Sequence, residues 1–184
     1  MEYTTEKFSR DIAAAEYIDG FRDAGRFLEL CKACPNYGKS WGCPPFGFDT
    51  DALLRRYDRV RLFATKIVPD QAGLPLECAQ ELVRPERVRI EREQLEMERR
   101  CGGLSLAYVG KCLYCPDGDC TRLCGMPCRH PDKVRPSLEA FGFDIGKTLA
   151  ELFGIELKWG TDGHLPSYLV LVSGVFYNAG TWTD

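Results

Sequence analysis

The 184-residue sequence has little of what several common classes of protein need. It contains only two histidines, which disfavours hydrolysis or deamination built on histidine side chains. No apolar run is long enough to cross a bilayer. The formal net charge is −3, without the strong basic excess that binding to nucleic acid or to a membrane surface needs. We therefore expect neither a nucleic acid nor a membrane as a partner.

Several motifs are also missing. There is no Walker A loop, no G-x-G-x-x-G after a strand and no nucleophile elbow, so whether the chain is an enzyme stays open. Residues 1–17 lack a basic segment followed by an apolar one, so we expect no signal peptide and a cytoplasmic location. Without an internal repeat or a low-complexity linker, residues 1–184 are expected to form a single cysteine-rich, metal-binding domain.

Cysteine, by contrast, is abundant, with ten residues. In a reducing cytoplasm, clustered cysteines are more often metal ligands than partners in disulfides. Two stand alone, Cys78 and Cys101, and such residues are usually small buried hydrophobes. The others form two groups, which are Cys31, Cys34 and Cys43, and then Cys112, Cys115, Cys120, Cys124 and Cys128.

The first group has the spacing C-x2-C-x8-C, and prolines follow Cys34 and Cys43. A C-x2-C turn lets two thiolates converge on one ion or cluster, with backbone N–H groups directed at the sulfurs. Three cysteines are an incomplete ligand set. A fourth ligand comes from the second group, from Cys78 or from Cys101, or one metal position stays open for a substrate.

The second group, C-x2-C-x4-C-x3-C-x3-C, holds five thiols, one more than a tetrahedral site uses. Cys112, Cys115 and Cys128 are the main candidates, and either Cys120 or Cys124 completes the set. The arginines that follow Cys128 either donate to sulfur or to a bound anion, or lie on the surface, and His130 is a minor candidate ligand.

The uneven spacing and the prolines favour one or two iron–sulfur clusters, [4Fe–4S] above all, over a single ion. We therefore predict an iron–sulfur protein with a redox or electron-transfer role and an unidentified redox partner. The alternative is a zinc-binding structural or interaction module without catalytic activity. The sequence does not indicate an oligomeric state.

The remaining pattern predicts an α+β fold, in which a small mixed or antiparallel sheet has helices packed on one face and carries the two cysteine-rich loops. A helix is expected near 19–31, and a short one runs from the Asp49–Asp51 cap to Tyr57. The later helices are expected at 76–100 and 145–153, and the strands at 59–68, 104–110, 155–160 and 167–177, the last two as an antiparallel pair joined by 161–166.

The helix at 76–100 has three distinguishing features. An apolar residue recurs every seven positions, at Leu76, Val83, Ile90 and Met97, which predicts a narrow buried stripe. Pro85 is expected to break or kink the helix, and Gly102 and Gly103 to end it. Its charged residues are expected to form i,i+4 ion pairs on a solvated face, namely Arg87–Glu91, Arg89–Glu93 and Arg92–Glu96.

At its cysteine motifs the sequence resembles the metal-binding proteins grouped as domain of unknown function 2284. The resemblance rests on "CKACPNYGKSWGCPP" at 31–45, on "GGLSLAYVGKC" at 102–112 and on "PCRHPDKVRPSLEAFGFDIG" at 127–146. It extends from about Asp19 to the closing "SYLVLVSGVFYN".

This resemblance implies one metal site at Cys31, Cys34 and Cys43. It implies a second site at Cys112, Cys115, Cys128 and one further cysteine. In the family, the third cysteine of the second group lies closer to the C-x2-C pair than Cys120 does here, and Cys124 is additional. The family carries no established activity, so the resemblance concerns the site and not a reaction.

Overall fold

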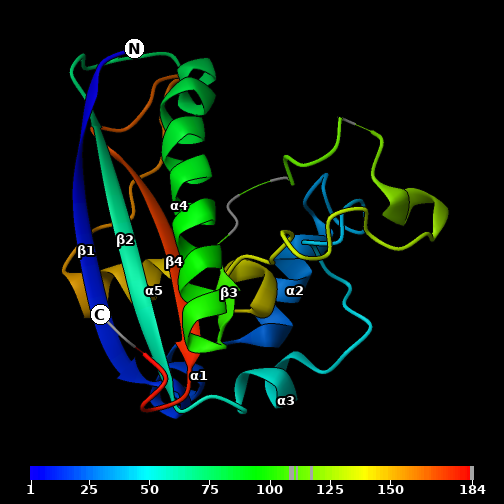
Figure 1. Cartoon of the computed structure of the whole chain (residues 1–184). Coiled ribbons are helices and arrows are strands. Elements are labelled where there is room, and N and C mark those ends of the chain that lie inside the picture. Colours follow the sequence, from blue (N-terminus) through cyan, green and yellow to red (C-terminus); the bar gives the residue numbers. More distant parts are fainter. Residues whose placement is uncertain (108–109, 111, 117, 183–184) are drawn as a thin grey trace.

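The computed structural model describes residues 1–107, 110, 112–116 and 118–182 (Figure 1). Its centre is a four-stranded antiparallel sheet with the strand order β1-β2-β4-β3. The strands are β1 (Tyr3–Ala13), β2 (Arg59–Pro69), β3 (Leu104–Leu106) and β4 (Leu169–Tyr177). The α+β prediction is confirmed, and the sheet is antiparallel rather than mixed.

Side chains alternate between the two faces of a strand, so each strand contributes residues to both faces of the sheet. Both faces carry buried apolar residues. One face, with Leu62 of β2 and Phe176 of β4, packs on α1 (Ala14–Phe21) and α5 (Ile145–Thr148). The opposite face carries Ile67 and Leu171, which pack against Leu82 and Ile90 of α4 (Ala79–Cys101). Figure 1 shows α4 lying along one face and α5 behind the sheet. The expectation of helices on one face only was therefore wrong.

Helix α4 follows the 3₁₀ turn η1 (Leu76–Cys78) and confirms the predicted long helix. Pro85 lies within the helix and does not end it. Gly102 ends it in the left-handed region at φ 62°, as expected. The predicted stripe is wrong at its start, because Leu76 is 45% exposed while Ile90 is buried.

The prediction that the ion pairs of α4 lie on a solvated face is wrong for one pair. Arg87 and Glu91 are joined at 2.7 Å, and their side chains are only 6% and 8% exposed. The Arg89–Glu93 pair is confirmed at 2.5 Å. The Arg92–Glu96 pair stays a prediction.

Other helices and strands can also be compared with the predictions. The helix expected at 19–31 is two helices, α1 and α2 (Ala24–Lys32), and the Asp23 side chain caps the second by accepting from Arg26 N at 3.0 Å. The short helix is confirmed as α3 (Thr50–Leu54), capped by Asp49. The strand expected at 155–160 is absent from these described residues, and β1 was not predicted.

The helix expected at 145–153 is confirmed as α5 followed by the π-helical turn η4 (Leu149–Phe153). The strand expected at 104–110 is present as β3, and its residues 108 and 109 lie outside the described residues. Two further 3₁₀ turns are η2 (Thr121–Cys124) and η3 (Glu139–Phe141).

The segments that carry the two cysteine groups lie on the same side of the molecule, beyond α4 and away from the sheet (Figure 1). Within the described part of the chain, no helix has both the length and the apolar composition to cross a bilayer.

Candidate metal centre

The first cysteine loop folds back on itself directly after α2. Cys31 lies in the last turn of that helix, and Cys34 donates its N–H to Cys31 O at 3.0 Å. Gly38, at φ 69°, donates its N–H to Pro44 O at 2.9 Å, which brings the end of the loop back against its middle. A positive φ of this kind favours glycine. The loop therefore returns Cys43 toward the C-x2-C pair.

Two sulfurs of this loop accept hydrogen bonds. The N–H of Asn36 lies 3.5 Å from Cys34 Sγ, and the Ser40 hydroxyl lies 3.3 Å from Cys43 Sγ. Hydrogen bonds of this kind commonly surround the sulfurs of metal-binding cysteines. Cys34 is exposed, whereas Cys31 and Cys43 are partly buried.

The pKa of the Cys31 thiol depends on its burial and on the charged groups around it. Burial raises the pKa of the Cys31 thiol, and the charges of Cys34, Cys43 and Glu139 raise it further. A bound cation would offset this effect of the neighbouring charges on Cys31.

The second group surrounds a cavity of about 260 Å³. Four of its five cysteines line this cavity, namely Cys112, Cys115, Cys120 and Cys128. Cys124 is not among the lining residues. Its thiol is exposed and donates to Thr121 O at 3.2 Å. The structure therefore groups Cys120, and not Cys124, with the other three.

Hydrogen-bond donors also face the sulfurs of this second group. Arg129 Nη1 lies 3.9 Å from Cys115 Sγ and forms an ion pair with Asp119 at 2.9 Å. The backbone N–H of His130 lies 3.3 Å from Cys128 Sγ. Of the two readings of the arginines after Cys128, the contact to sulfur applies to Arg129.

A single arginine fastens the two loops together, and we call this contact the Arg122 clasp. The guanidinium of Arg122 lies over the Trp41 ring, 5.3 Å from its centroid. Trp41 Nε1 in turn donates to Thr121 Oγ1 at 3.3 Å. Arg122 donates to three backbone carbonyl oxygens of the first loop, those of Ser40 at 2.6 Å, Cys43, and Pro45 at 2.5 Å. The sequence analysis did not single out Arg122. Its only sequence signal is a basic residue between Cys120 and Cys124.

The two isolated cysteines pack in apolar clusters. Cys101 is buried beside Val175 and Tyr177, and Cys78 packs on the cluster around Ile67. Both are thus surrounded by apolar side chains at the sheet and not by the other cysteines.

Glu139 in η3 is a polar residue that the sequence analysis missed. Burial raises the pKa of its carboxyl group, against the opposing effect of hydrogen bonds from its own backbone N–H and from Ser137. Its Oε2 atom is buried and has no hydrogen-bond partner among the described residues. The available signal was an acid between Leu138 and Phe141, in an otherwise apolar stretch.

The donor set fits a thiophilic metal. All ten cysteines are free thiols, and thiolates select zinc and iron–sulfur clusters. Among the described residues, no three His, Cys, Asp or Glu side chains are already placed to hold a metal ion.

Comparisons with known proteins agree with this chemistry. A family model described as "Predicted metal-binding protein (DUF2284)" matches residues 20–176, which is most of the chain. Neither the curated proteins nor the solved structures gave a significant match.

Proposed function

Because the chain belongs to the DUF2284 family of predicted metal-binding proteins, we propose that it binds an iron–sulfur cluster and exchanges electrons through it. Cys112, Cys115, Cys120 and Cys128 are the ligands of a [4Fe–4S] cluster. The observation that carries the proposal is the cavity of about 260 Å³ that these four cysteines line. Four thiolates are the usual ligand set of such a cluster.

The size of the cavity favours a cluster over a single ion. A zinc ion holds its sulfurs at about 2.3 Å, so four thiolates around zinc leave no open space between them. A cubane fills a larger space with its own iron and sulfide. The cavity, which the four cysteines line together with residues of the first loop such as Ser40 and Trp41, has room for such a group and therefore supports iron–sulfur more than zinc.

A bound cluster would supply one-electron redox chemistry, and the neighbouring residues would tune it. Arg129 and the N–H of His130 donate to the sulfurs of Cys115 and Cys128, which offsets negative charge and favours the reduced state. Trp41 lies at the cavity and limits its contact with water. The same fold leaves Cys34 exposed, which gives a redox partner access near the loops.

We further propose that the chain works in the reducing cytoplasm, where its thiols stay free to bind metal. The ten free cysteines support this location. The redox partner is unidentified, and the proposal requires neither a membrane nor a nucleic acid.

The proposal is tested by measuring iron, zinc and acid-labile sulfide per chain after purification without oxygen, with visible and EPR spectra before and after reduction. About four irons and four sulfides are expected for one cubane, with a spectrum that bleaches on reduction. Zinc without sulfide, in a colourless protein that unfolds on chelation, would overturn the proposal and establish the structural zinc alternative.

A further inference from the structure

We propose that the cleft between α4 and the segment of the second cysteine group binds an elongated organic anion. The ligand carries an aromatic part and several phosphate or carboxylate groups. This site is distinct from the cysteine cavity, and the inference does not depend on which metal the cysteines bind. Three observations carry it, which are the cavities along α4, the cations that line them and the position of Tyr114.

A cavity of about 540 Å³ follows one stripe of α4. The stripe consists of residues spaced three or four apart, namely Arg84, Val88, Arg92, Leu95 and Arg99. From its first residue to its last, the helix advances about 22 Å, at about 1.5 Å per residue. Small-molecule sites typically have volumes of about 300–1,000 Å³, so the cavity has the size of such a site and its length suits an elongated ligand.

The segment of the second cysteine group forms the opposite wall. Leu113, Tyr114 and Lys133 line the cavity from this side. A further cavity of about 530 Å³ shares Arg84, Leu113 and Tyr114 with the first, so the two adjoin. We call the two cavities together the α4 groove. This part of α4 is therefore one wall of a cleft rather than an open helix surface.

The α4 groove is rich in cations, although the whole chain has a formal net charge of −3. The first cavity is lined by two carboxylates and by four cations, namely Arg84, Arg92, Arg99 and Lys133. One of the carboxylates, Glu91, is buried and already bound by Arg87 at 2.7 Å. The Tyr114 side chain also donates a hydrogen bond to it. An anion that enters the groove therefore meets mainly cations, which attract it electrostatically.

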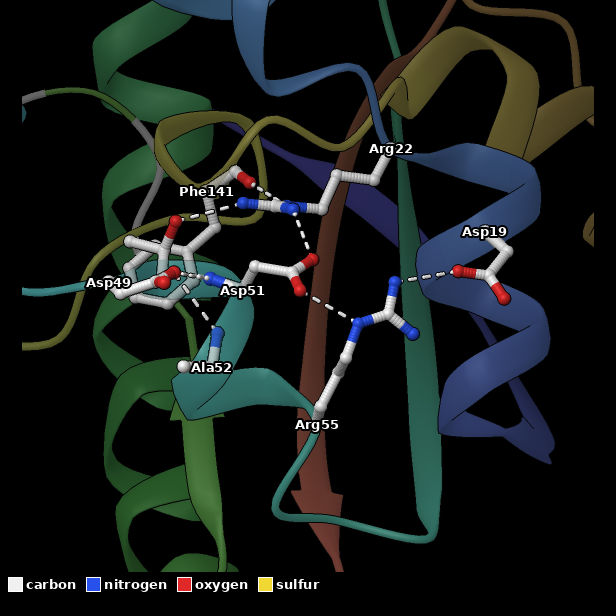
Figure 2. Close-up of polar contacts among 8 residues, drawn as sticks. Asp19, Arg22, Asp49, Asp51, Ala52, Arg55 and Phe141 are labelled. Atoms are coloured by element: carbon white, nitrogen blue, oxygen red, sulfur yellow. Dashed lines mark hydrogen bonds and ion pairs between the residues drawn. The ribbon is translucent and has the colours of Figure 1, made fainter.

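Several of these cations are available to a ligand. Elsewhere in the fold, arginines at the contacts between helices are occupied by acids, and Figure 2 shows Arg22 and Arg55 both bound to Asp51. Within the described part of the chain, three exposed cations of the groove have no carboxylate at ion-pair distance, namely Arg84, Arg99 and Lys133. Such side chains bind phosphate and carboxylate groups, and arginine does so through paired hydrogen bonds.

Apolar residues between the cations indicate that the ligand also has an apolar, planar part. Val88 and Leu95 lie on the helix side of the groove, and Leu113 and Tyr114 lie opposite. Val88 is 53% exposed, so this surface is open to a ligand. Aliphatic and aromatic walls with a few charged groups are typical of small-molecule sites, and a tyrosine ring offers a face for stacking.

Tyr114 connects the groove to the cysteine cavity. Its side chain lines both cavities of the groove and also the cavity of about 260 Å³ that the four cysteines line. Cys115 lines the second groove cavity and the cysteine cavity, and the His130 ring lies 5.8 Å from the Tyr114 ring between centroids. A ligand in the groove is therefore bound directly beside the proposed cluster.

The test uses four probes in calorimetric titrations at low salt, with the full chain purified without oxygen. ATP combines an aromatic ring with phosphates, mellitate combines one with carboxylates, tripolyphosphate has only the charge, and adenosine has only the ring. ATP, mellitate or both are expected to bind saturably with a dissociation constant below about 1 mM. Which of the two binds more tightly distinguishes phosphate from carboxylate. Tripolyphosphate should bind at least ten-fold more weakly than the better aromatic probe, and adenosine should not bind.

Substitutions at exposed positions locate the bound probe. Arg99→Gln should weaken binding about ten-fold, because a charge-assisted hydrogen bond is lost. Arg56→Gln is the matched control, since Arg56 is exposed and lies outside the groove. Val88→Glu places a carboxylate among the cations and should abolish binding, whereas Val88→Gln, of similar size but neutral, should retain most of it.

The proposal is overturned if neither ATP nor mellitate binds, or if Val88→Glu binds as well as Val88→Gln. Equal weakening by Arg56→Gln and Arg99→Gln would overturn it as well, because the attraction would then be general to the surface. Metal analysis of the same samples separates this inference from the proposed function. A chain without iron that binds the probe in the groove retains the inference, and an iron-containing chain that binds neither aromatic probe retains only the proposed function.

Discussion

The sheet and the cysteine loops are held together by different interactions. In the sheet, strands β1 and β2 pair residue by residue from Tyr3–Pro69 to Ala13–Arg59, and apolar clusters bury both faces. The loops have short 3₁₀ turns, side-chain-to-backbone bonds and exposed apolar residues such as Leu123 and Met126. We expect the sheet to be stable by itself, whereas the order of the loops depends on the Arg122 clasp and on a bound metal. Each prediction below perturbs one of these regions and asks whether the other responds.

The largest expected effect is on metal content, and it separates two neighbouring cysteines of the loops. Cys120→Ser should lose nearly all the metal of its site, because Cys120 lines the cavity. Cys124→Ser should keep it, because that thiol donates to Thr121 O and lies outside the lining. Metal analysis of both variants checks this. Equal losses would show that the cavity does not define the ligand set.

A core substitution should affect the sheet and leave the loops unchanged. Leu62 is fully buried in β2, so Leu62→Ala should lower the free energy of unfolding by about 3 kcal/mol. Urea unfolding measures this change. Metal per folded chain should stay constant, and a proportional fall in metal would contradict the independence of the two regions.

The next substitution perturbs the loops and should leave the sheet unchanged. Arg122→Lys replaces a planar group that reaches three carbonyl oxygens with a single point charge. Local opening of residues 31–45 should become easier by about 1–2 kcal/mol, or about ten-fold in hydrogen exchange. Exchange in β2 and β4 should not change. Arg56→Lys, at an exposed position, is the control and should leave both regions as in the wild type.

The smallest effect is a pH dependence within the sheet. Burial alone would raise the pKa of Asp11, but hydrogen bonds from Tyr177, Arg59 and Arg61 outweigh it and lower the pKa. A lowered pKa contributes stability above the unfolded value of about 4, which is lost as the pH falls through the folded value. At pH 6 the free energy of unfolding of the wild type should exceed that of Asp11→Asn by about 1 kcal/mol.

That advantage should shrink below pH 4, as urea unfolding at several pH values will show. Any effect of acid on a metal is shared by both proteins, so their difference isolates Asp11. A constant difference across this range would mean that the ionised carboxylate is not what stabilises the β1–β2 edge.

The sequence predicted the parts of the fold whose local pattern agrees with their final environment. Strands β2 and β4 are rich in β-branched and apolar residues and were found within one or two residues of their bounds. Strand β1 was missed because it is charged and only Ile12 in it is buried, as is common for an edge strand. Residues 155–160 have strand-like composition, but pairing with a neighbour is a tertiary property that composition does not carry.

The candidate site, like the fold, could be predicted only where a local sequence pattern is sufficient. Spacing alone grouped the eight clustered cysteines, because ligands on a short loop are neighbours in sequence. The choice between Cys120 and Cys124 needed the direction of each thiol, which depends on the η2 turn. Arg122 contacts the first loop across a long sequence separation, so its local signal, a basic residue between Cys120 and Cys124, did not indicate that contact.

The Arg122 clasp has one consequence for how this protein can vary. Arg122 recognises the first loop through the carbonyl oxygens of Ser40, Cys43 and Pro45, which every amino acid possesses. Side chains there, including the cysteine itself, can change while the docking of one loop on the other is retained. This part of the docking between the loops therefore places no requirement on the side chains at positions 40, 43 and 45.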